Sequence, residues 1–427
     1  MLESFQKEQG MPSSHLVIWA ISFVSIALML LRPRRISEVW WVCGGAIILI
    51  LFHLISLATA WHAIAEGTDV YLFLTGMMLL AQLAQTHGVF DWLATVAIQK
   101  AKGSRTRLFA LIYGVGTIVT IFMSNDATAV VLTPAVLAAV KKSKAEPLPY
   151  LFVCAFIANA ASFVLPISNP ANLVVFHQGM PPLGKWLQTF VVASLLSVLV
   201  TYAALRWYCR RELEGKIESN IRDGHLSDSG KLAFAGIGFV AVALLVASAL
   251  GKDLGLPTCA ASFLVTFVIC LRERANPLNL AKGISWSVLP LVAGLFILVE
   301  AVNNAGALHL SQMLLHSLQS WNATAAALTV SFGVGVGANL INNLPLGLIA
   351  GASVREAHIA GVLRNAILIG IDLGPNLSVT GSLATILWLI EIRKKDLHVS
   401  AWTFLKAGIV VMPLALLLAA LAIAAIG

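Results

Sequence analysis

Polar clusters interrupt long apolar runs at four places in this 427-residue chain. Two are compact, Ser124-Asn125-Asp126-Ala127-Thr128 and Asn342-Asn343-Leu344-Pro345, and each lies between apolar arms. These arms are about one hydrocarbon thickness long at most, so each cluster is predicted to be the tip of a re-entrant hairpin. The other two span 159–172 and 372–385 and contain Pro or Gly, which break helices. Backbone groups freed inside a bilayer must be satisfied by protein, ions or water.

The side chains in these clusters are mostly amides and hydroxyls. No Lys or Arg occurs in 120–134, 159–176, 338–351 or 370–389. Such a site suits a neutral polyhydroxyl solute or a small cation such as sodium. An anion is less favoured, although helix N-termini and a co-bound sodium can supply positive potential. The predicted substrate-binding residues are Ser124, Asn125, Thr128, Ser168, Asn169, Asn172, Asn342, Asn343, Thr380, Gly381, Ser382 and Thr385.

Two acids fall within the same clusters, Asp126 and Asp372. A carboxylate inside a bilayer is costly unless it is partnered, and it is therefore a functional candidate by default. We predict that both residues couple transport to proton exchange. Glu300 is a weaker third candidate that buttresses the site. Polar residues in membrane helices also join helices by hydrogen bonds, but four clusters at matching positions favour a binding site.

The composition places the chain in a membrane. Hydrophobic residues make up 59% of it and charged residues 11%, which excludes an ordinary soluble globular protein. The apolar runs predict an all-α polytopic membrane protein with about ten transmembrane helices and two re-entrant hairpins. The basic cluster Arg32, Arg34, Arg35 follows the first apolar run, which indicates an uncleaved first span and no signal peptide. The five cysteines are scattered and predict neither a metal site nor disulfides.

Two stretches of the chain repeat each other with an offset of 218 residues. The matched positions are Gly76, Gln82, Gln85, Gly88 and Ser124-Asn125 against Gly294, Glu300, Asn303, Gly306 and Asn342-Asn343. Duplicated bundles with interrupted helices are typical of carriers with a midplane binding site. The predicted organisation is two N-terminal helices (1–69), a first repeat (70–209), a cytoplasmic linker (210–231) and a second region (232–427) with its inverted repeat from about 286.

The basic residues orient the bundle. If each hairpin enters and leaves the membrane on the same side, all but five of the 28 Lys and Arg residues lie on one face of the bundle. That face is predicted to be cytoplasmic, with both termini outside. Basic residues flank the first hairpin but not the second, so the two hairpins are expected to open to opposite sides. Amphipathic stretches at 89–102 and 307–319 are predicted to lie along the interface. The five exceptions are Lys7, Lys185, Lys252, Arg355 and Arg364.

At these same clusters the chain resembles the arsenite/antimonite efflux permease family, the arsenical pump membrane proteins of the ion-transporter superfamily. The most specific match is Gly370 to Trp388, supported by 124–134, 168–172 and 342–345. The resemblance implies extrusion of trivalent arsenic or antimony as the hydroxide from a bacterial cytoplasmic membrane. The driving force would be proton entry or an associated cytoplasmic ATPase. Asn159 stands where that family is expected to carry an acid, and Pro170 replaces an aliphatic residue, which leaves proton coupling to Asp126 and Asp372.

Other functions remain as alternatives. Sodium/proton antiporters and sodium-coupled carboxylate carriers of the same superfamily share the architecture, so the fold alone does not choose among them. A passive channel would conduct without a proton gradient. An enzyme is disfavoured because the sequence has no clustered His/Cys set and no nucleotide-binding glycine motif. No cofactor and no nucleic-acid partner are expected; the expected partners are the lipid bilayer, arsenite or antimonite, and protons.

Overall fold

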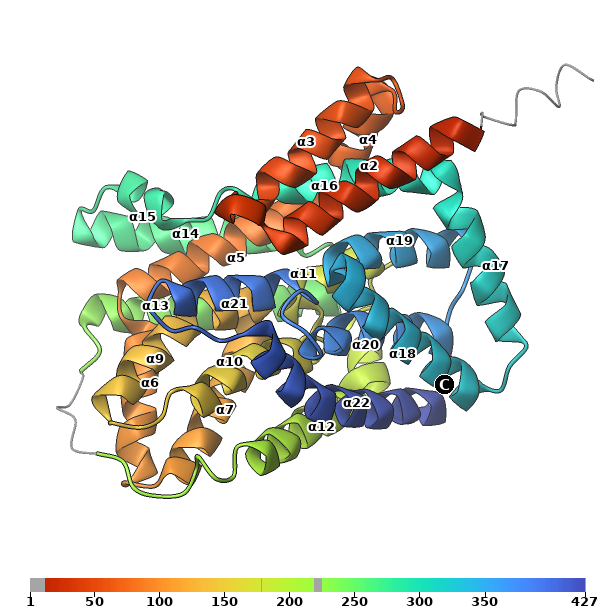
Figure 1. The fold of residues 1–427 in the computed structure, drawn as a ribbon. Coiled ribbons are helices and arrows are strands. Elements are labelled where there is room, and N and C mark those ends of the chain that lie inside the picture. The colour runs from red at the N-terminus through yellow and green to blue at the C-terminus, as the bar shows by residue number, and fades with distance from the viewer. Residues whose placement is uncertain (1–11, 178, 219–224, 427) are drawn as a thin grey trace, which may run out of the picture.

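The computed structural model describes residues 12–177, 179–218 and 225–426 (Figure 1). Every regular element among these residues is a helix, apart from one isolated bridge between Ser104 and Lys216. The remaining residues, which include Lys7 and Arg222 of the predicted charge distribution, lie outside the described part of the chain. The predicted all-α class is confirmed.

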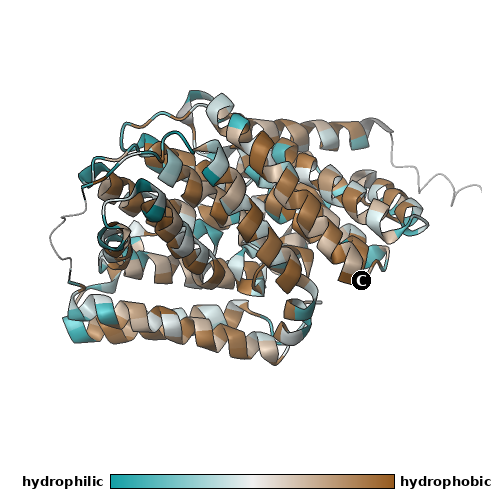
Figure 2. Cartoon of the chain, turned by 90° about the horizontal axis from the view of Figure 1, so that it is seen from below, coloured by the Kyte–Doolittle hydropathy of each residue, from teal (hydrophilic) through white to brown (hydrophobic). Residues whose placement is uncertain are grey.

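Eight of the described helices are long and apolar enough to cross a membrane, or nine if the bent pair α4 and α5 is one span. Their exposed surface is largely apolar, with Phe23, Phe239, Phe267 and Ile409 among the exposed side chains. Figure 2 shows the hydrophobic colour along the helices and much of the hydrophilic colour near their ends. The shorter α3 (Glu38–Leu51) and the two interrupted helices complete a polytopic membrane protein.

The duplication extends through most of the described chain. Most helix bounds recur 218 residues later, to within two residues. The pairs are α2 (Pro12–Leu31) with α13 (Asp228–Ala249), α3 with α14 (Gly255–Glu273), α5 (Thr68–Thr86) with α16 (Val288–Val302), α6 (Val89–Ala101) with α17 (Leu308–Gln319), and α12 (Leu183–Tyr208) with α22 (Ala401–Ile426).

Helices of each half pack against helices of the other half. α3 packs on α16, and in the same way α14 packs on α5. α4 (Leu57–Glu66) contacts α16, while its counterpart α15 (Pro277–Gly283) contacts α5. A Cβ at Gly76 would come within 2.7 Å of the Thr258 backbone, and one at Gly294 within 2.8 Å of Val42. These crossings explain why both repeats carry glycine at this position.

The hairpins enter the bundle from opposite ends, as predicted. The first consists of α7 (Arg105–Met123), the short α8 (Asn125–Ala127), η2 (Thr128–Leu132) and α9 (Thr133–Lys142). The second consists of α18 (Ala323–Ile341) and α19 (Asn343–Glu356). In Figure 1 the base of the first hairpin is at the left and that of the second at the right. We call these the Lys394 end and the Arg355 end, after a residue at each.

Each tip turns at one residue with positive φ. Ser124 has φ 80° and ψ 160°, and Asn342, its counterpart 218 residues later, has φ 76° and ψ 149°. These backbone angles are rare for residues other than glycine. Asn342 stabilises its turn by accepting a hydrogen bond from the Leu344 N–H at 3.3 Å. The turn places the next helix so that its first residues face the centre of the bundle.

Two helices break in the middle of the bundle. The first interruption lies between α10 (Leu148–Ala160) and α11 (Pro170–Val175), with η3 (Pro166–Ser168) between them. The second lies between α20 (Val362–Leu373) and α21 (Leu383–Arg393), with η5 (Gly374–Asn376) between them. α11 packs against α19 and α21 packs against η2. Each far arm therefore contacts the hairpin of the opposite half.

Candidate functional site

Both hairpin tips and both far arms meet at a central cavity, whose empty space is about 340 Å³ when its part open to solvent is included. Asn125 and Asp126 come from the first tip, Asn343 from the second, and Asn169 from the start of α11. The start of α21 and apolar residues of α5 and α16 complete the wall. The predicted convergence of the four polar clusters is therefore present in the structure, and the amides of both halves face one space.

A larger cavity connects this centre to the Lys394 end. It has a volume of about 1090 Å³ including its part open to solvent, and Asp126 and Leu74 line both cavities. Gln82 and Gln85 of α5 lie along its wall. Further lining residues are Glu391 and Lys394, which form an ion pair of 2.6 Å with each other. Sequence reasoning did not assign these four residues to the site, although both glutamines belong to the repeat.

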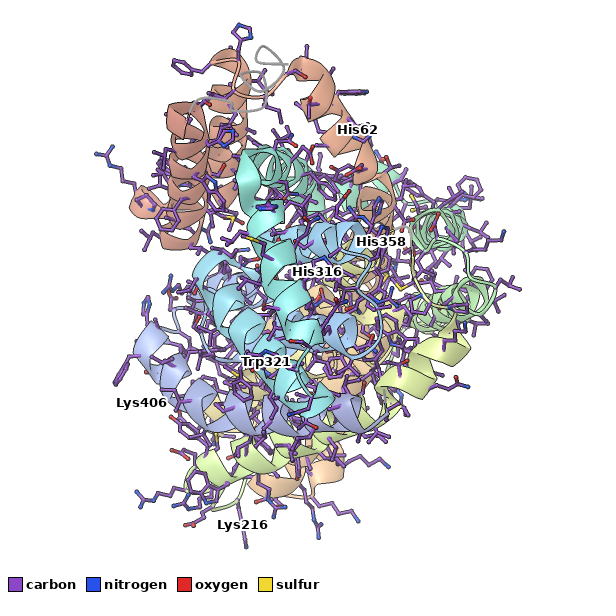
Figure 3. All side chains as sticks on the ribbon, turned by 90° about the vertical axis from the view of Figure 1, so that its right-hand side faces the viewer. His62, Lys216, His316, Trp321, His358 and Lys406 are labelled. Carbon is purple, nitrogen blue, oxygen red and sulfur yellow. The ribbon has the colours of Figure 1, made fainter. Side chains whose placement is uncertain are left out.

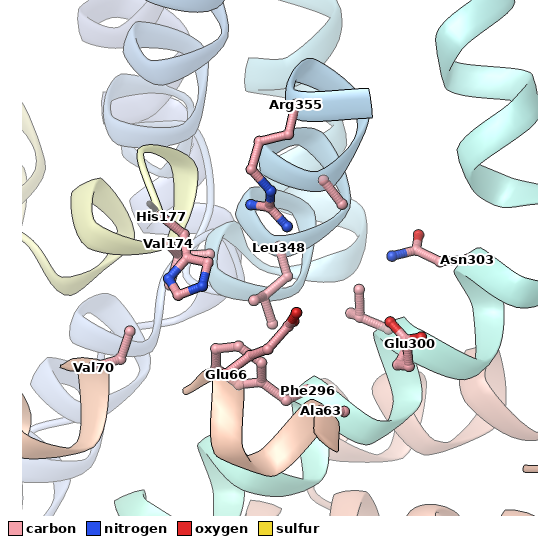
Figure 4. A pocket seen from close by; sticks show the side chains of 12 residues that line it. Ala63, Glu66, Val70, Val174, His177, Phe296, Glu300, Asn303, Leu348 and Arg355 are labelled. Atoms are coloured by element: carbon pink, nitrogen blue, oxygen red, sulfur yellow. The ribbon is translucent and has the colours of Figure 1, made fainter. Parts of the chain in front are cut away.

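A smaller cavity of about 470 Å³ lies toward the Arg355 end. Glu66, His177, Glu300 and Arg355 line it, and Figure 4 shows these side chains converging from separate elements. Many lining positions are the counterparts of the larger cavity, since Glu300 and Asn303 correspond to Gln82 and Gln85. The two cavities are thus repeat-related, but the one at the Lys394 end is larger.

Apolar residues separate the smaller cavity from the centre. Val70 and Leu348 line the smaller cavity, and Leu74 and Leu344, each one helical turn away, line the central one. The three cavities therefore follow the same helices from end to end. This arrangement describes a path that is open to the centre from the Lys394 end and narrowed by side chains toward the Arg355 end.

Asn125 and Asp126 are the tip residues best placed to contact a solute. Asn125 is buried, and its Oδ1 has no hydrogen-bond partner among the described residues. Asp126 is partly exposed and lies where the central and larger cavities join. An unpartnered buried amide oxygen facing a cavity requires an explanation, and a bound solute or ion would supply one.

Asp372 lies behind the cavity wall. It is fully buried, and its Oδ1 accepts a hydrogen bond of 2.7 Å from Asn169 Nδ2. Its Oδ2 has no hydrogen-bond partner in the described part of the chain. Asn169 in turn accepts a hydrogen bond from the Ala171 N–H at 3.0 Å, which caps α11. Asp372 thus contacts the central cavity through Asn169, whereas Asp126 contacts it directly.

Asn159 is a member of this network that we did not predict as a site residue. It donates to Asn376 Oδ1 at 3.0 Å and to Thr385 Oγ1 at 3.3 Å, and it accepts from Ser382 Oγ at 3.1 Å. In the two interruptions Asn159 and Ser382 are the counterparts of Asp372 and Asn169, each 213 residues apart. The alignment of the two breaks in the sequence was the signal that could have identified it.

Several other predicted residues hold the tips and breaks in shape. Their polar groups pair within the protein: Thr128 with Thr120 Oγ1 at 2.8 Å, Ser168 with the Ile121 carbonyl at 3.0 Å, Asn172 with the Ser162 carbonyl at 2.8 Å, Asn342 with the Thr380 carbonyl at 3.1 Å, and Thr380 with the Asn339 carbonyl at 2.9 Å. The Gly381 carbonyl accepts from the Asn343 N–H at 2.8 Å. None of these six residues lines the central cavity. Gly381 is linked to it only through the hydrogen bond with Asn343.

The part of the chain that the structure describes contains no group of three or more His, Cys, Asp or Glu residues that could hold a metal ion. Cys154, the cysteine that lies in an interrupted span, is buried. The polar side chains that line the central cavity are three amides and one carboxylate, which can bind a solute by hydrogen bonds.

The sequence profile of a family described as citrate transporter (CitMHS) matches residues 19–371. An arsenical pump membrane protein of Escherichia coli is 25% identical over 410 residues, which cover 92% of this chain and 95% of that protein. A putative arsenical pump membrane protein of Bacillus subtilis is 24% identical over 92% of this chain and 96% of its own length.

A solved structure shares the fold at low sequence identity. The YdaH transporter of Alcanivorax borkumensis, whose crystal structure is described as having an unusual topology, superposes with a TM-score of 0.56. It is 12% identical, and the match covers 86% of this chain and 87% of that one. This likeness concerns the fold alone.

Proposed function

We propose that this chain, which belongs to the citrate transporter family (CitMHS), exports trivalent arsenic or antimony hydroxide in exchange for protons. The family and the apolar helices make it a membrane transporter. The relatives named as arsenical pump membrane proteins support the choice of substrate. The site chemistry described next supports it independently.

The observation that carries this proposal is the charge of the central cavity. No Lys or Arg lines it among the described residues, and its one charged group is Asp126. A citrate anion would meet a like charge and no fixed cation there, which opposes binding in a medium of low dielectric constant. Arsenic(III) hydroxide is mostly uncharged near neutral pH, and its hydroxyl groups can pair with Asn125, Asn169 and Asn343. The cavity therefore suits the neutral hydroxide better than citrate.

The direction of transport follows from charge and shape. Short segments at the Lys394 end carry most of the basic residues, so this end would face the bacterial cytoplasm. The larger cavity opens there, so the described state would load solute from inside. Release would follow a rearrangement that opens the smaller cavity at the Arg355 end, which would face outward. Both described chain ends lie at that outer end (Figure 1).

Asp126 would carry the proton. An ionised carboxylate accepts hydrogen bonds from a bound hydroxide, whereas a protonated one loses much of this capacity. Proton binding from outside would thus favour release of the solute, and the protonated site would return to the inner side, where the proton leaves. Asp372 would affect this cycle through the orientation of Asn169.

Transport into inside-out vesicles tests the proposal. The vesicles carry this chain and no ATPase, and arsenite accumulation is measured with the interior acidified. The native chain should accumulate arsenite without ATP. We expect Asp126→Asn to lower the proton-driven component by roughly 10²-fold, the lower range for a lost proton-transfer group. The matched control is Asp91→Asn, an exposed acid on α6.

Two outcomes would reject parts of this account. Undiminished proton-driven accumulation in both Asp126→Asn and Asp372→Asn would reject proton coupling by these residues. ATP-dependent accumulation restored only by a cytoplasmic fraction would favour an associated ATPase docked at the Lys394 end. Folding of each variant is checked by its thermal unfolding in detergent, so that loss of protein is not mistaken for loss of coupling.

A sodium/proton antiporter is the second candidate. Asn125 Oδ1 and Asp372 Oδ2 are buried oxygens without partners, and oxygen ligands suit sodium. This alternative predicts proton flux that depends on sodium and needs no arsenite. The same vesicles, given a sodium gradient and a pH-sensitive dye, distinguish the two functions.

A further inference from the structure

A basic cavity lies at the Arg355 end, beside the smaller cavity of the path. It has a volume of about 620 Å³ including its part open to solvent, and it is formed by the end of α11, the end of α19 and the start of α20. His177, Arg355, His358 and Arg364 line it, and no Asp or Glu does so among the described residues. Figure 3 looks onto this end of the bundle and shows His358 on it.

Arg364 has no carboxylate partner among the described residues. Its side chain is half-buried, and its Nε is buried without a hydrogen bond. The ring of Phe176 covers the guanidinium at 4.6 Å, which leaves the edge of the group free to bind. No described carboxylate lies within 4.0 Å of Arg364 or Arg355, in contrast to Arg32, which pairs with Glu38 at 3.0 Å. A half-buried guanidinium of this kind is expected to have an anionic partner.

The helix that carries Arg364 adds to the positive potential. Arg364 is in the first turn of α20, and Gly361 at the N-cap supplies no side-chain hydrogen bond. The positive end of a helix dipole disfavours a cation and favours an anion. Arg355, by contrast, is in the last turn of α19, where a cation is favourable. The dipole of its own helix therefore favours the charge of Arg355 and disfavours that of Arg364.

His177 contributes less positive charge than the two arginines. Burial, followed by the neighbouring Arg355, lowers the pKa of His177, while Glu66 and Asp253 act in the opposite direction. A lowered pKa favours the neutral imidazole, which can still donate a hydrogen bond. The permanent positive charges of the cavity are the guanidiniums of Arg355 and Arg364. Their N–H groups can donate hydrogen bonds to the oxygens of a phosphate or carboxylate.

We propose that this cavity is an oxyanion-binding site in which Arg364 and Arg355 hold a phosphate or carboxylate group. Phe176 supports the guanidinium of Arg364, and His358 lies on the exposed side. The anion would come from the outer solution or from a phospholipid headgroup, which offer the same chemistry. The site is separate from the central cavity, so the proposal stands whatever solute that cavity carries.

Phosphate binding to the purified protein tests the site. Delipidated protein in a neutral detergent is titrated with inorganic phosphate, and thermal unfolding and calorimetry report binding. We expect Arg364→Gln and Arg355→Gln each to weaken binding about tenfold or more, because each removes a charged hydrogen-bond donor. Arg364→Lys keeps the charge without the planar fork and should give an intermediate loss.

The control is Lys252→Gln, which removes an exposed cation and should leave phosphate binding unchanged. Equal phosphate affinity in the native, Arg364→Gln and Lys252→Gln proteins would overturn the proposal, as would the absence of binding at 10 mM phosphate, a concentration about tenfold above a 1 mM dissociation constant. If Arg364→Gln does not fold, Arg355→Gln and Arg364→Lys decide the question.

Nanodiscs distinguish the two sources of the anion. In phosphatidylcholine discs, free phosphate should bind in either case. In phosphatidylglycerol discs, weaker apparent phosphate binding and an Arg364-dependent lipid adduct in native mass spectrometry would identify a headgroup site. Unchanged phosphate affinity in both discs would identify a site for a free anion.

Discussion

Asn159 and Asp372 occupy equivalent positions in the two halves, and each contacts the residue that begins the far arm of the other half. Ser382 Oγ donates to Asn159 Oδ1, and Asn169 Nδ2 donates to Asp372 Oδ1. The shared feature is an acceptor oxygen at the end of the first arm. The amide at 159 meets this need without a charge, so the charge of Asp372 is not required for the contact itself.

A double-mutant cycle on Asn169 and Asp372 tests this contact. Asn169→Ala removes both the cap of α11 and the donor to a buried carboxylate, and it should lower the unfolding temperature more than Asp372→Asn, which keeps an acceptor oxygen. The cycle itself uses the native protein, Asn169→Ala, Asp372→Ala and the double alanine variant. The double variant should lose less stability than the two single alanine variants together, with a coupling free energy of about 1–3 kcal/mol. Thermal unfolding in detergent measures all four proteins. Strict additivity would mean that the two side chains do not stabilise each other.

At the level of the elements, the second interruption depends on a close helix crossing. A Cβ added at Gly374 in η5 would overlap the backbone of Gly335 in α18. The first half carries Thr117 and Ala161 at the counterpart positions, so the second half brings its hairpin arm closer to its own break. This crossing places Asn339, whose Nδ2 donates to the Gly374 carbonyl at 2.8 Å.

Gly374→Ala is therefore expected to destabilise the protein by about 1–3 kcal/mol or more, because the clash is with backbone and not with a flexible side chain. The matched control is Gly333→Ala on α18, where an added Cβ meets nothing within 4 Å. Since alanine favours helix over glycine, the control should be neutral or slightly stabilising. Unfolding temperatures compare the two variants, and equal behaviour would show that the crossing is not as tight as described.

At the scale of the whole molecule, the sequence was most informative where a helix must break inside the bilayer. The tips at Ser124 and Asn342 and the two interruptions were predictable because apolar runs make polar residues, Pro and Gly conspicuous. The role of Asn172 was not, since an amide can face a cavity or pair with nearby carbonyls, and only the folded backbone decides. The similarity of α2 to α13 was also hidden, because helices facing lipid need only be apolar.

The unequal cavities imply two states of the molecule, which cysteine labelling can detect. Met78 lines the larger cavity, and its counterpart Phe296 lines the smaller one. In a background without the five native cysteines, Met78→Cys should react with a membrane-impermeant maleimide from the Lys394 end. Phe296→Cys should react from the Arg355 end about tenfold more slowly, because the described state narrows that side.

Arsenite with an imposed proton gradient should then slow labelling of Met78→Cys and speed that of Phe296→Cys, since exchange of the two repeat-related conformations closes one cavity as it opens the other. The control is a cysteine at Asp91, which is exposed on α6 and should label at one rate throughout. Changes of the same sign at both positions would indicate a general loosening of the bundle, and no change at either would indicate a fixed channel. Reciprocal changes, by contrast, require that the halves alternate around the central cavity.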